Sequence, residues 1–451
     1  MKILKTLAIG ALALATAGVA SAQTVIRIVA SNGDRTATQT AISKLLAPGW
    51  TYQGLSGNTS SSGDLAIATG SNAGAWSGTY AGNPVIIKAT YAGALAGIAA
   101  VASNPKTNQR FVVSNGTGSG AVPNPLTGTS LGVDYELGTA DFGFSTNFQS
   151  TSPFSGVFQG VQYDGVTEEI VGISPLGFYA SPGFPGSPSS SNSTYVPNIT
   201  TQLAQQLYKS GSLTLDLFTG DVADANKTVW AIGRNTDAGQ RFGAYTEIGL
   251  GTQSQVTVWL PAITGTTTTS GITYGGTVNS HQLWPVATQP GTFAVPLGSG
   301  GYNSGANLAA PLTAVLSAPV YRGDYLDDEG APQSLYPSAT AGYYIGYLTP
   351  GDANNRVLGA NGVVPLANRG VALTYNGVAL TNANVRSGRY TAWLYNRILK
   401  PTSGLTGDKL TFANALRDQI KSVDAPAGGG IFDDASVLVK RYTDGGFVVK
   451  K

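Results

Sequence analysis

The stretch Gly233-Arg234-Asn235-Thr236-Asp237-Ala238-Gly239-Gln240-Arg241 is the part of the chain from which the fold is best understood. It follows an apolar, strand-like run at 228–232 and leads into 242–248, whose apolar spacing is typical of a helix. A strand that turns into a helix leaves free backbone N–H groups at the helix start, where the helix dipole favours a negative charge. With two arginines in the same turn, the stretch predicts an anion site. The alternative is that Asp237 caps the helix and both arginines are solvated surface charges.

The composition indicates a folded protein rich in turns and β-structure. At about 150 residues per domain, a chain of 451 residues predicts two or three domains. Charged residues make up only 11% of the chain and glycine fills 60 positions, which is unlike a highly charged disordered chain. Removal of the first 23 residues, with Lys2 and Lys5, takes 26 basic residues to 24, against 24 acidic ones. A neutral chain without a basic patch argues against nucleic-acid binding.

Residues 1–23 have the pattern of a secretory signal peptide. Lys2 and Lys5 form a positive start, 7–19 is apolar, and Ala20-Ser21-Ala22 is a small-residue cleavage site. The chain has no cysteine, so it has neither a lipid-attachment site nor a disulfide. No later run is long and apolar enough to span a bilayer. We therefore expect a periplasmic or secreted protein that does not span a membrane.

Three other segments repeat all or part of the order strand, polar loop, helix. They are strand 25–29 with loop 31–36, strand 84–89 with loop 90–93, and the strand-to-loop segment 140–146. Repeated units of this kind predict a largely parallel sheet, and ligands on such sheets lie beyond the carboxyl ends of the strands. We expect the three loops to meet at one rim. Taken singly, each loop is also compatible with an ordinary connection.

These features, in this order and spacing, resemble extracytoplasmic solute-binding proteins of the type II periplasmic-binding fold, closest to their phosphate-binding subgroup. The matching segments are 31–36, 91–93, 141–146, 170–179, Arg234 with 237–241, and 344–347. The resemblance implies an α/β fold of two lobes, each a mixed sheet flanked by helices, with loop insertions rich in Ser, Thr and Gly. It implies lobe 1 at 24–170 and 349–451 and lobe 2 at 171–348. It also implies an oxyanion such as phosphate in the cleft and an ABC transporter membrane component as partner.

Carried across by motif, the anion ligands fall mainly on the opening stretch. Arg234 matches the arginine that pairs with the anion, and the amides of Gly239 and Gln240 stand at the helix start. The family has Ser-Gly-Thr where this chain has Ala238-Gly239-Gln240, so two hydroxyls are missing. Arginine can bind an oxyanion with two hydrogen bonds, so Arg35 and Arg241 are expected to compensate for the two missing hydroxyls.

Thr146 departs from the family in a way that bears on ligand choice. The phosphate binders have an aspartate at this position, which accepts the proton of protonated phosphate. A buried acid would repel a fully ionised oxyanion, so threonine favours an anion other than phosphate or a pocket that has lost its ligand. The complete candidate ligand set is Arg234, Asp237, Gly239, Gln240, Arg241, Asp34, Arg35, Tyr91, Ser145 and Thr146.

Two function classes follow from the sequence, and an enzyme is a distant third. The first is a solute-binding protein that closes its lobes over a small oxyanion. The second is a secreted structural, surface or adhesive protein that retains the fold without transport-linked binding. His281 is the only histidine and lacks the partners of a catalytic or metal site, so we interpret it as a structural or surface histidine. We predict no catalytic residue, metal or cofactor.

Overall fold

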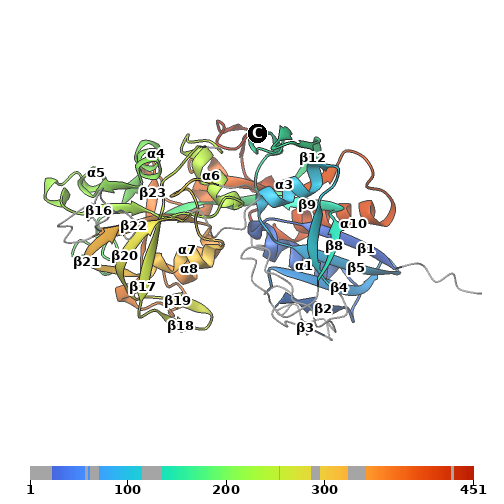
Figure 1. Ribbon diagram of the computed structural model, residues 1–451, viewed down its shortest axis with the longest axis horizontal. Helices are drawn as coiled ribbons and strands as arrows, with labels where there is room; N and C mark the ends of the chain where they lie inside the picture. The colour runs from blue at the N-terminus through green and yellow to red at the C-terminus, as the bar shows by residue number, and fades with distance from the viewer. Residues whose placement is uncertain are drawn as a thin grey trace, which may run out of the picture.

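Two lobes, each a mixed sheet with helices on its faces, lie side by side along the long axis of the molecule (Figure 1). The computed structural model describes residues 23–55, 59–60, 71–113, 135–252, 254–285, 295–322, 342–427 and 431–451. Apart from Gln23, the predicted signal peptide lies outside these residues. Within them, none of the helices has the length and hydropathy needed to cross a bilayer. The predicted two-lobe α/β fold is confirmed.

The first lobe is built on an eight-stranded sheet with a parallel centre. Its order is β12 (Val166–Pro175), β24 (Trp393–Pro401), β9 (Phe142–Ser145), β1 (Thr24–Val29), β5 (Asn83–Thr90), β4 (Ala73–Tyr80), β2 (Thr51–Gly54) and β3 (Thr59–Ser60). Strand β1 runs parallel to β5 and β9, as the repeated strand–loop–helix units predict. The loops after these three strands therefore lie at the same edge of the sheet.

Alternating side chains of β1 bury both faces of this sheet. Ile26 and Ile28 pack with α1 (Arg35–Leu45) and α10 (Gly407–Asp418), while Val29 packs with α3 (Ala94–Ala102) on the other face. Burial of such side chains stabilises the lobe by about 1.5–3 kcal/mol each. Helix α3 follows β5 directly, so its start lies at the edge where the strand-end loops meet (Figure 1).

The second lobe is built on a six-stranded sheet around a fully buried central strand. Its order is β14 (Asn198–Ile199), β23 (Val371–Tyr375), β13 (Gly177–Ala180), β22 (Gly342–Leu348), β16 (Thr228–Ala231) and β15 (Ser212–Thr214). Helices α4 (Thr201–Ser210) and α6 (Gly239–Glu247) cover one face, and α7 (Gly305–Ala309) and α8 (Pro350–Arg356) cover the other. A smaller sheet of β17 (Trp259–Thr264), β20 (Thr277–Leu283) and β21 (Val315–Arg322) lies beside it.

The antiparallel pair β12 and β24 connects the two cores. Its register runs from Val166 opposite Pro401 to Pro175 opposite Trp393, and β12 continues into β13 of the second sheet. Ile173 belongs to the apolar cluster of the second lobe, whereas Val171 belongs to that of the first. The predicted crossing at 170–179 thus corresponds to β12 and β13.

Strand β23 lies in a different sheet from the one the sequence indicated. Residues 349–451 were assigned to the first lobe, but β23 pairs antiparallel with β13 and parallel with β14. The chain returns to the first sheet only at β24. The Asn376-Gly377 turn indicates local strand structure but carries no information about the distant partner strand, which explains the difference.

Candidate functional site

A small cavity is lined by residues of both lobes, at the start of α6 and in the strand-end loops of the first sheet. Its volume is about 20 Å³. It is lined by Asn32, Gly33, Ala92, Gly93 and Thr146 from the first lobe and by Arg234, Asn235, Ala238, Gly239 and Gln240 from the second. The predicted convergence of loops 31–36, 90–93 and 141–146 with the opening stretch is therefore present in the structure.

Helix α6 presents unpaired amides to this cavity. Its N-cap is Ala238, which makes no side-chain capping bond, so Asp237 does not cap the helix as the alternative interpretation held. Within the described chain, the backbone N–H groups of Gly239 and Gln240 have no hydrogen-bond acceptor. Such amides, together with the helix dipole, form a ready anion-binding arrangement.

Arg234 is a buried cation held in place by protein acceptors. Its Nε donates to Tyr302 O at 3.0 Å, one Nη to Asn303 O at 3.3 Å, and the other Nη to Gln240 Oε1. Each Nη carries a second hydrogen, and neither of these has an acceptor among the described residues. Burial lowers the pKa of Arg234, and the charge of Asp352 acts in the opposite direction. The guanidinium nevertheless stays charged at neutral pH, since arginine titrates far above it.

The first lobe adds polar groups that also lack partners. The Oδ1 atom of Asn32 is buried and has no hydrogen-bond partner among the described residues. Turning the amide places Nδ2 there and adds a donor. The Thr146 hydroxyl reaches only Asn147 Oδ1, at 3.5 Å. A buried polar group without a partner costs about 1–3 kcal/mol, so a ligand that pairs with these groups recovers that loss.

The two lobes touch directly around the cavity. The Leu95 N–H donates to Asp237 O at 3.4 Å, and a Cβ built on Gly93 would lie 2.6 Å from the same oxygen. A Cβ on Gly239 would come within 1.7 Å of Thr146 Oγ1. A cavity of about 20 Å³ has room for one or two water-sized groups. A tetrahedral oxyanion therefore fits only if the lobes move slightly apart.

Among the predicted ligand residues, Arg234, Gly239, Gln240 and Thr146 line the cavity, and the others lie elsewhere. Asp237 contributes its backbone oxygen to the contact between lobes. Arg241 donates to Arg234 O at 3.0 Å, to Gly300 O at 2.8 Å and to Ser299 Oγ at 3.2 Å. Its guanidinium lines a different cavity, which is described below.

The remaining predicted ligands bond within the first lobe. Asp34 accepts from Ser31 Oγ and from Asn396 Nδ2, and burial raises its pKa to about 6 against the lowering effects of those bonds and of Arg397. Arg35 donates to Asn72 Oδ1. The Tyr91 hydroxyl accepts from Thr38 at 2.9 Å, and Ser145 Oγ accepts from the Asn147 N–H at 3.0 Å.

Sequence reasoning missed six residues that line the cavity. They are Asn32, Gly33, Ala92, Gly93, Asn235 and Ala238. All of them lie in loops that the sequence singled out, but as small or amide residues they carry no charge that would mark them. These residues offer mainly backbone groups to the cavity, and the glycines have no side chain that would cover those groups.

His281 is packed in the second lobe in a structural setting. It is buried, its Nδ1 lies 3.2 Å from the Tyr344 hydroxyl, and its ring centroid lies 4.2 Å from that of Trp230 and 4.3 Å from that of Trp259. In the part of the chain that the structure describes, no three His, Cys, Asp or Glu side chains are grouped so that they could hold a metal ion.

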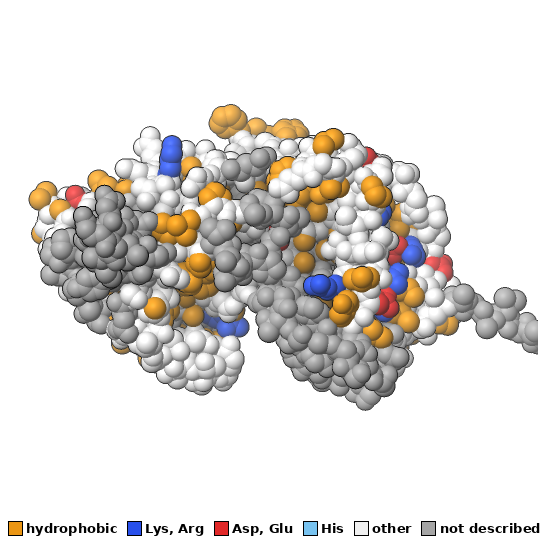
Figure 2. Space-filling model, in the orientation of Figure 1, with side chains coloured by type: hydrophobic (Ala, Val, Ile, Leu, Met, Phe, Trp, Pro, Cys, Tyr) orange, Lys and Arg blue, Asp and Glu red, His pale blue; other side chains and the backbone are white. Residues whose placement is uncertain are grey.

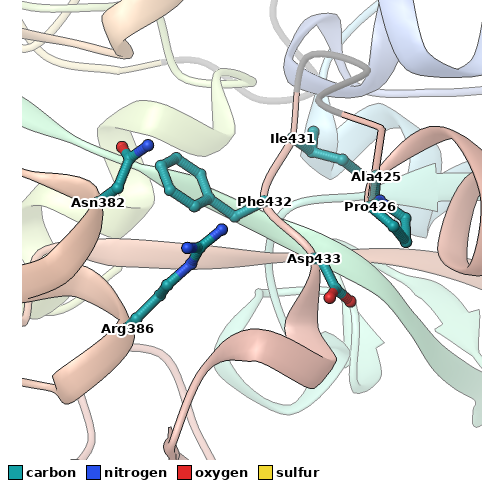
Figure 3. A pocket seen from close by; sticks show the side chains of 7 residues that line it. All are labelled: Asn382, Arg386, Ala425, Pro426, Ile431, Phe432 and Asp433. Atoms are coloured by element: carbon teal, nitrogen blue, oxygen red, sulfur yellow. The ribbon is translucent and has the colours of Figure 1, made fainter.

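Another cavity, of about 330 Å³, lies beside the crossing strands (Figure 3). Figure 3 shows Asn382 and Arg386 of α9 (Asn382–Ser387) on one side and Ala425 and Pro426 on the other, with the segment of Phe432 between them. Its charged groups are of both signs, and Arg386 is exposed. This cavity therefore lacks the buried cationic donors of the cavity at Arg234.

Comparison with known proteins gives matches only to solved structures. No protein-family model matches the chain, and no curated protein matches in sequence. An ABC-type phosphate transport receptor from Vibrio cholerae is 12% identical, with 90% of this chain and 99% of that one covered and a TM-score of 0.41. A phosphate ABC transporter substrate-binding protein from Clostridium perfringens, with phosphate bound, is 11% identical over 91% and 99%, with a TM-score of 0.38.

A third similar structure, from Planctomyces limnophilus, is described as that of a possible phosphate-binding protein. It is 10% identical, with 92% of this chain and 95% of that one covered and a TM-score of 0.39. Matches at these identities and TM-scores do not identify a ligand for this chain, so its ligand is inferred below from its own residues.

Proposed function

We propose that this protein is a solute-binding protein that holds a small inorganic oxyanion between its two lobes. The observation that carries the proposal is the meeting of two unpaired helix-start amides and the buried Arg234 guanidinium in one interlobe cavity. Arg234 forms no ion pair with Asp or Glu in the described chain. A buried positive charge without an acidic partner is costly, so an anion stabilises a form in which the lobes are slightly further apart and both still contact it.

The fixed geometry of Arg234 supports this role. Tyr302, Asn303 and Gln240 hold the guanidinium in one orientation, so little side-chain entropy is lost when an anion binds. Because lining residues come from both lobes, a bound anion makes contacts that exist only when the lobes are together. A ligand with such differential affinity shifts the population toward the closed form.

We further propose that the protein works in the periplasm or after secretion, and that its closed form is recognised by a membrane component of an ABC transporter. The signal-peptide pattern of residues 1–23 supports the location. Charged side chains on the face in Figure 2 are few and mixed in sign. This is compatible with recognition by shape rather than by a charged patch.

A ligand screen tests the anion proposal. Thermal unfolding of the mature protein is followed with phosphate, sulfate, molybdate and small carboxylates, because a ligand that binds only the native state raises its stability by RT ln(1 + [L]/Kd). We expect one inorganic oxyanion to raise the melting temperature saturably and Arg234→Ala to lose this ligand-induced rise. Arg389→Ala, at an exposed arginine, is the matched control and should keep it.

A second candidate function is a secreted structural or adhesive protein that retains the fold. It is favoured by the direct contact between Gly239 and Thr146 and by the three protein acceptors of Arg234. This function predicts no saturable stabilisation by any of the anions. It also predicts small-angle scattering profiles that are the same with and without them.

A further inference from the structure

A second interlobe cavity, of about 390 Å³, also begins at α6 but shares no lining residue with the cavity at Arg234. Its first-lobe wall comes from the segment around the hairpin of β10 (Gly156–Phe158) and β11 (Val161–Tyr163). Its lining includes Phe158, Thr236, Arg241, Phe242 and Ser299. A cavity of this size suits a small organic molecule.

The buried part of the cavity contains a cation with no acidic partner. Arg241 is 5% exposed and forms no ion pair with Asp or Glu in the described chain. Its Nη1 atom spends both hydrogens on the backbone oxygens of Arg234 and Gly300, and its Nη2 gives one to Ser299 Oγ. Among the described residues, Nε–H and the second Nη2–H have no acceptor, so both are open to an anion.

Two residues that line the same cavity carry hydroxyl groups. Thr236 is 1% exposed, and its Oγ1 has no hydrogen-bond partner in the part of the chain that is described. Ser299 Oγ accepts from Arg241 Nη2 at 3.2 Å and from the Val256 N–H at 3.4 Å, which leaves its own hydrogen free to donate. A buried hydroxyl without a partner is costly, so a hydrogen-bond acceptor is the group that this cavity lacks.

The rest of the lining is apolar within and polar at the mouth. Phe242 is buried and Phe158 half-buried, and both line the cavity. At the mouth, Gln159, Ser254 and Gln255 are exposed. A ligand with an anionic head and an apolar body matches this distribution, because the head meets the donors and the body replaces water against the two rings.

We infer that this cavity is a binding site for a small organic carboxylate, distinct from the inorganic anion site. The carboxylate accepts hydrogen bonds from Arg241 and Thr236, and the apolar body packs against Phe158 and Phe242. The planar fork of arginine matches a carboxylate in shape as well as charge. Since Phe158 belongs to the first lobe and Arg241 to the second, the carboxylate also holds the lobes together.

Isothermal titration calorimetry with benzoate tests this site, with neutral benzamide as the matched probe of the same shape. We expect benzoate to bind saturably and benzamide to bind at least about tenfold more weakly, because the charged hydrogen bonds to Arg241 are lost. Equal binding of the two compounds, or no saturable heat with benzoate, overturns the inference.

Two variants locate the benzoate without removing the structural bonds of Arg241. Thr236→Val deletes the unpartnered hydroxyl and keeps the side-chain shape, and Phe158→Ala removes the first-lobe wall. Each should weaken benzoate about fivefold or more, while Val157→Ala, at a neighbouring residue that is 71% exposed, should not. Unchanged affinity in both test variants contradicts the site. Arg234→Ala should leave benzoate affinity within about twofold of the wild type, so failure here is separate from failure of the anion proposal.

Discussion

Gly239 lies so close to Thr146 that a Cβ carbon on Gly239 would come within 1.7 Å of the Thr146 hydroxyl oxygen. The first residue belongs to the start of α6 in the second lobe, and the other follows β9 in the first lobe. The same added carbon would lie 2.8 Å from the Ala94 Cβ. Only glycine therefore allows the two lobes to meet as closely as they do.

Substitution of Gly239 by alanine should open the molecule. Overpacking of this kind costs about 1–3 kcal/mol, and separating the lobes relieves the overlap. We expect Gly239→Ala to lower the free energy of unfolding by that amount and to raise the radius of gyration measured by small-angle scattering. Gly351→Ala is the control, because a Cβ on Gly351 would meet nothing within 4 Å. Identical radii for wild type and Gly239→Ala would contradict this account of closure.

Asp34 should make stability depend on pH. Burial raises its pKa from 3.8 to about 6, so the folded state binds a proton more readily than the unfolded state between these values. Stability from this group is therefore present at low pH and falls as pH rises through about 6. The total is roughly 3 kcal/mol, at 1.36 kcal/mol per pKa unit.

Asp34→Asn removes this titration while keeping hydrogen-bond partners for Ser31 and Asn396. We expect urea unfolding to show the variant gaining on the wild type by up to roughly 3 kcal/mol between about pH 4 and pH 7. Groups common to both proteins cancel in that difference. A stability difference that stays constant over this range would show that Asp34 does not titrate as its burial requires.

The ion pair of Arg441 and Glu247 should fix the C-terminal segment to the second lobe. The Nη1–Oε2 distance is 2.9 Å, and the two side chains are only 3% and 8% exposed. The Arg441 guanidinium also lies 4.3 Å from the centre of the Trp393 ring. Glu247→Gln leaves a buried charge unpaired, so we expect a loss of about 3–5 kcal/mol in chemical unfolding.

The control for this pair is Lys451→Ala. The ion pair of Lys451 with Asp434 has side-chain exposures of 31% and 18%, and solvent screens it. Such pairs contribute about 1 kcal/mol or less. If both substitutions cost the same, burial is not what makes the Arg441–Glu247 pair strong.

The sequence predicted the turn at 233–241 and the crossing at 170–179 because both depend on local pattern. The sequence did not show that Arg234 and Arg241 line two different cavities. Arg234 comes from the loop, whereas Arg241 lies in the first turns of α6, where each residue is rotated by about 100° from the last. That rotation can be assigned only when the helix start is known.

The directions of side chains within the loops also could not be predicted from the sequence. Tyr91 was a candidate ligand because of its position, but its hydroxyl bonds to Thr38 inside the first lobe. The next two residues, Ala92 and Gly93, line the cavity in its place. Likewise Asp34 bonds to Asn396, 362 positions away in the chain, and no local pattern specifies such a contact.

Thr146 should decide which oxyanion the interlobe cavity prefers. It lines the cavity, and it is 2% exposed, so a carboxylate placed there by Thr146→Asp would be buried beside the ligand. A fully ionised anion such as sulfate would be repelled, whereas phosphate keeps a proton near neutral pH that the aspartate can accept.

We therefore expect Thr146→Asp to move the ratio of phosphate to sulfate affinity toward phosphate by about tenfold or more, measured by calorimetry at neutral pH. Thr146→Asn has the same size without the charge and should leave the ratio near that of the wild type. If asparagine shifts the ratio as far as aspartate does, the effect arises from shape, and the charge argument for the preference at Thr146 is wrong. If neither variant shifts the ratio, the anion does not contact this position.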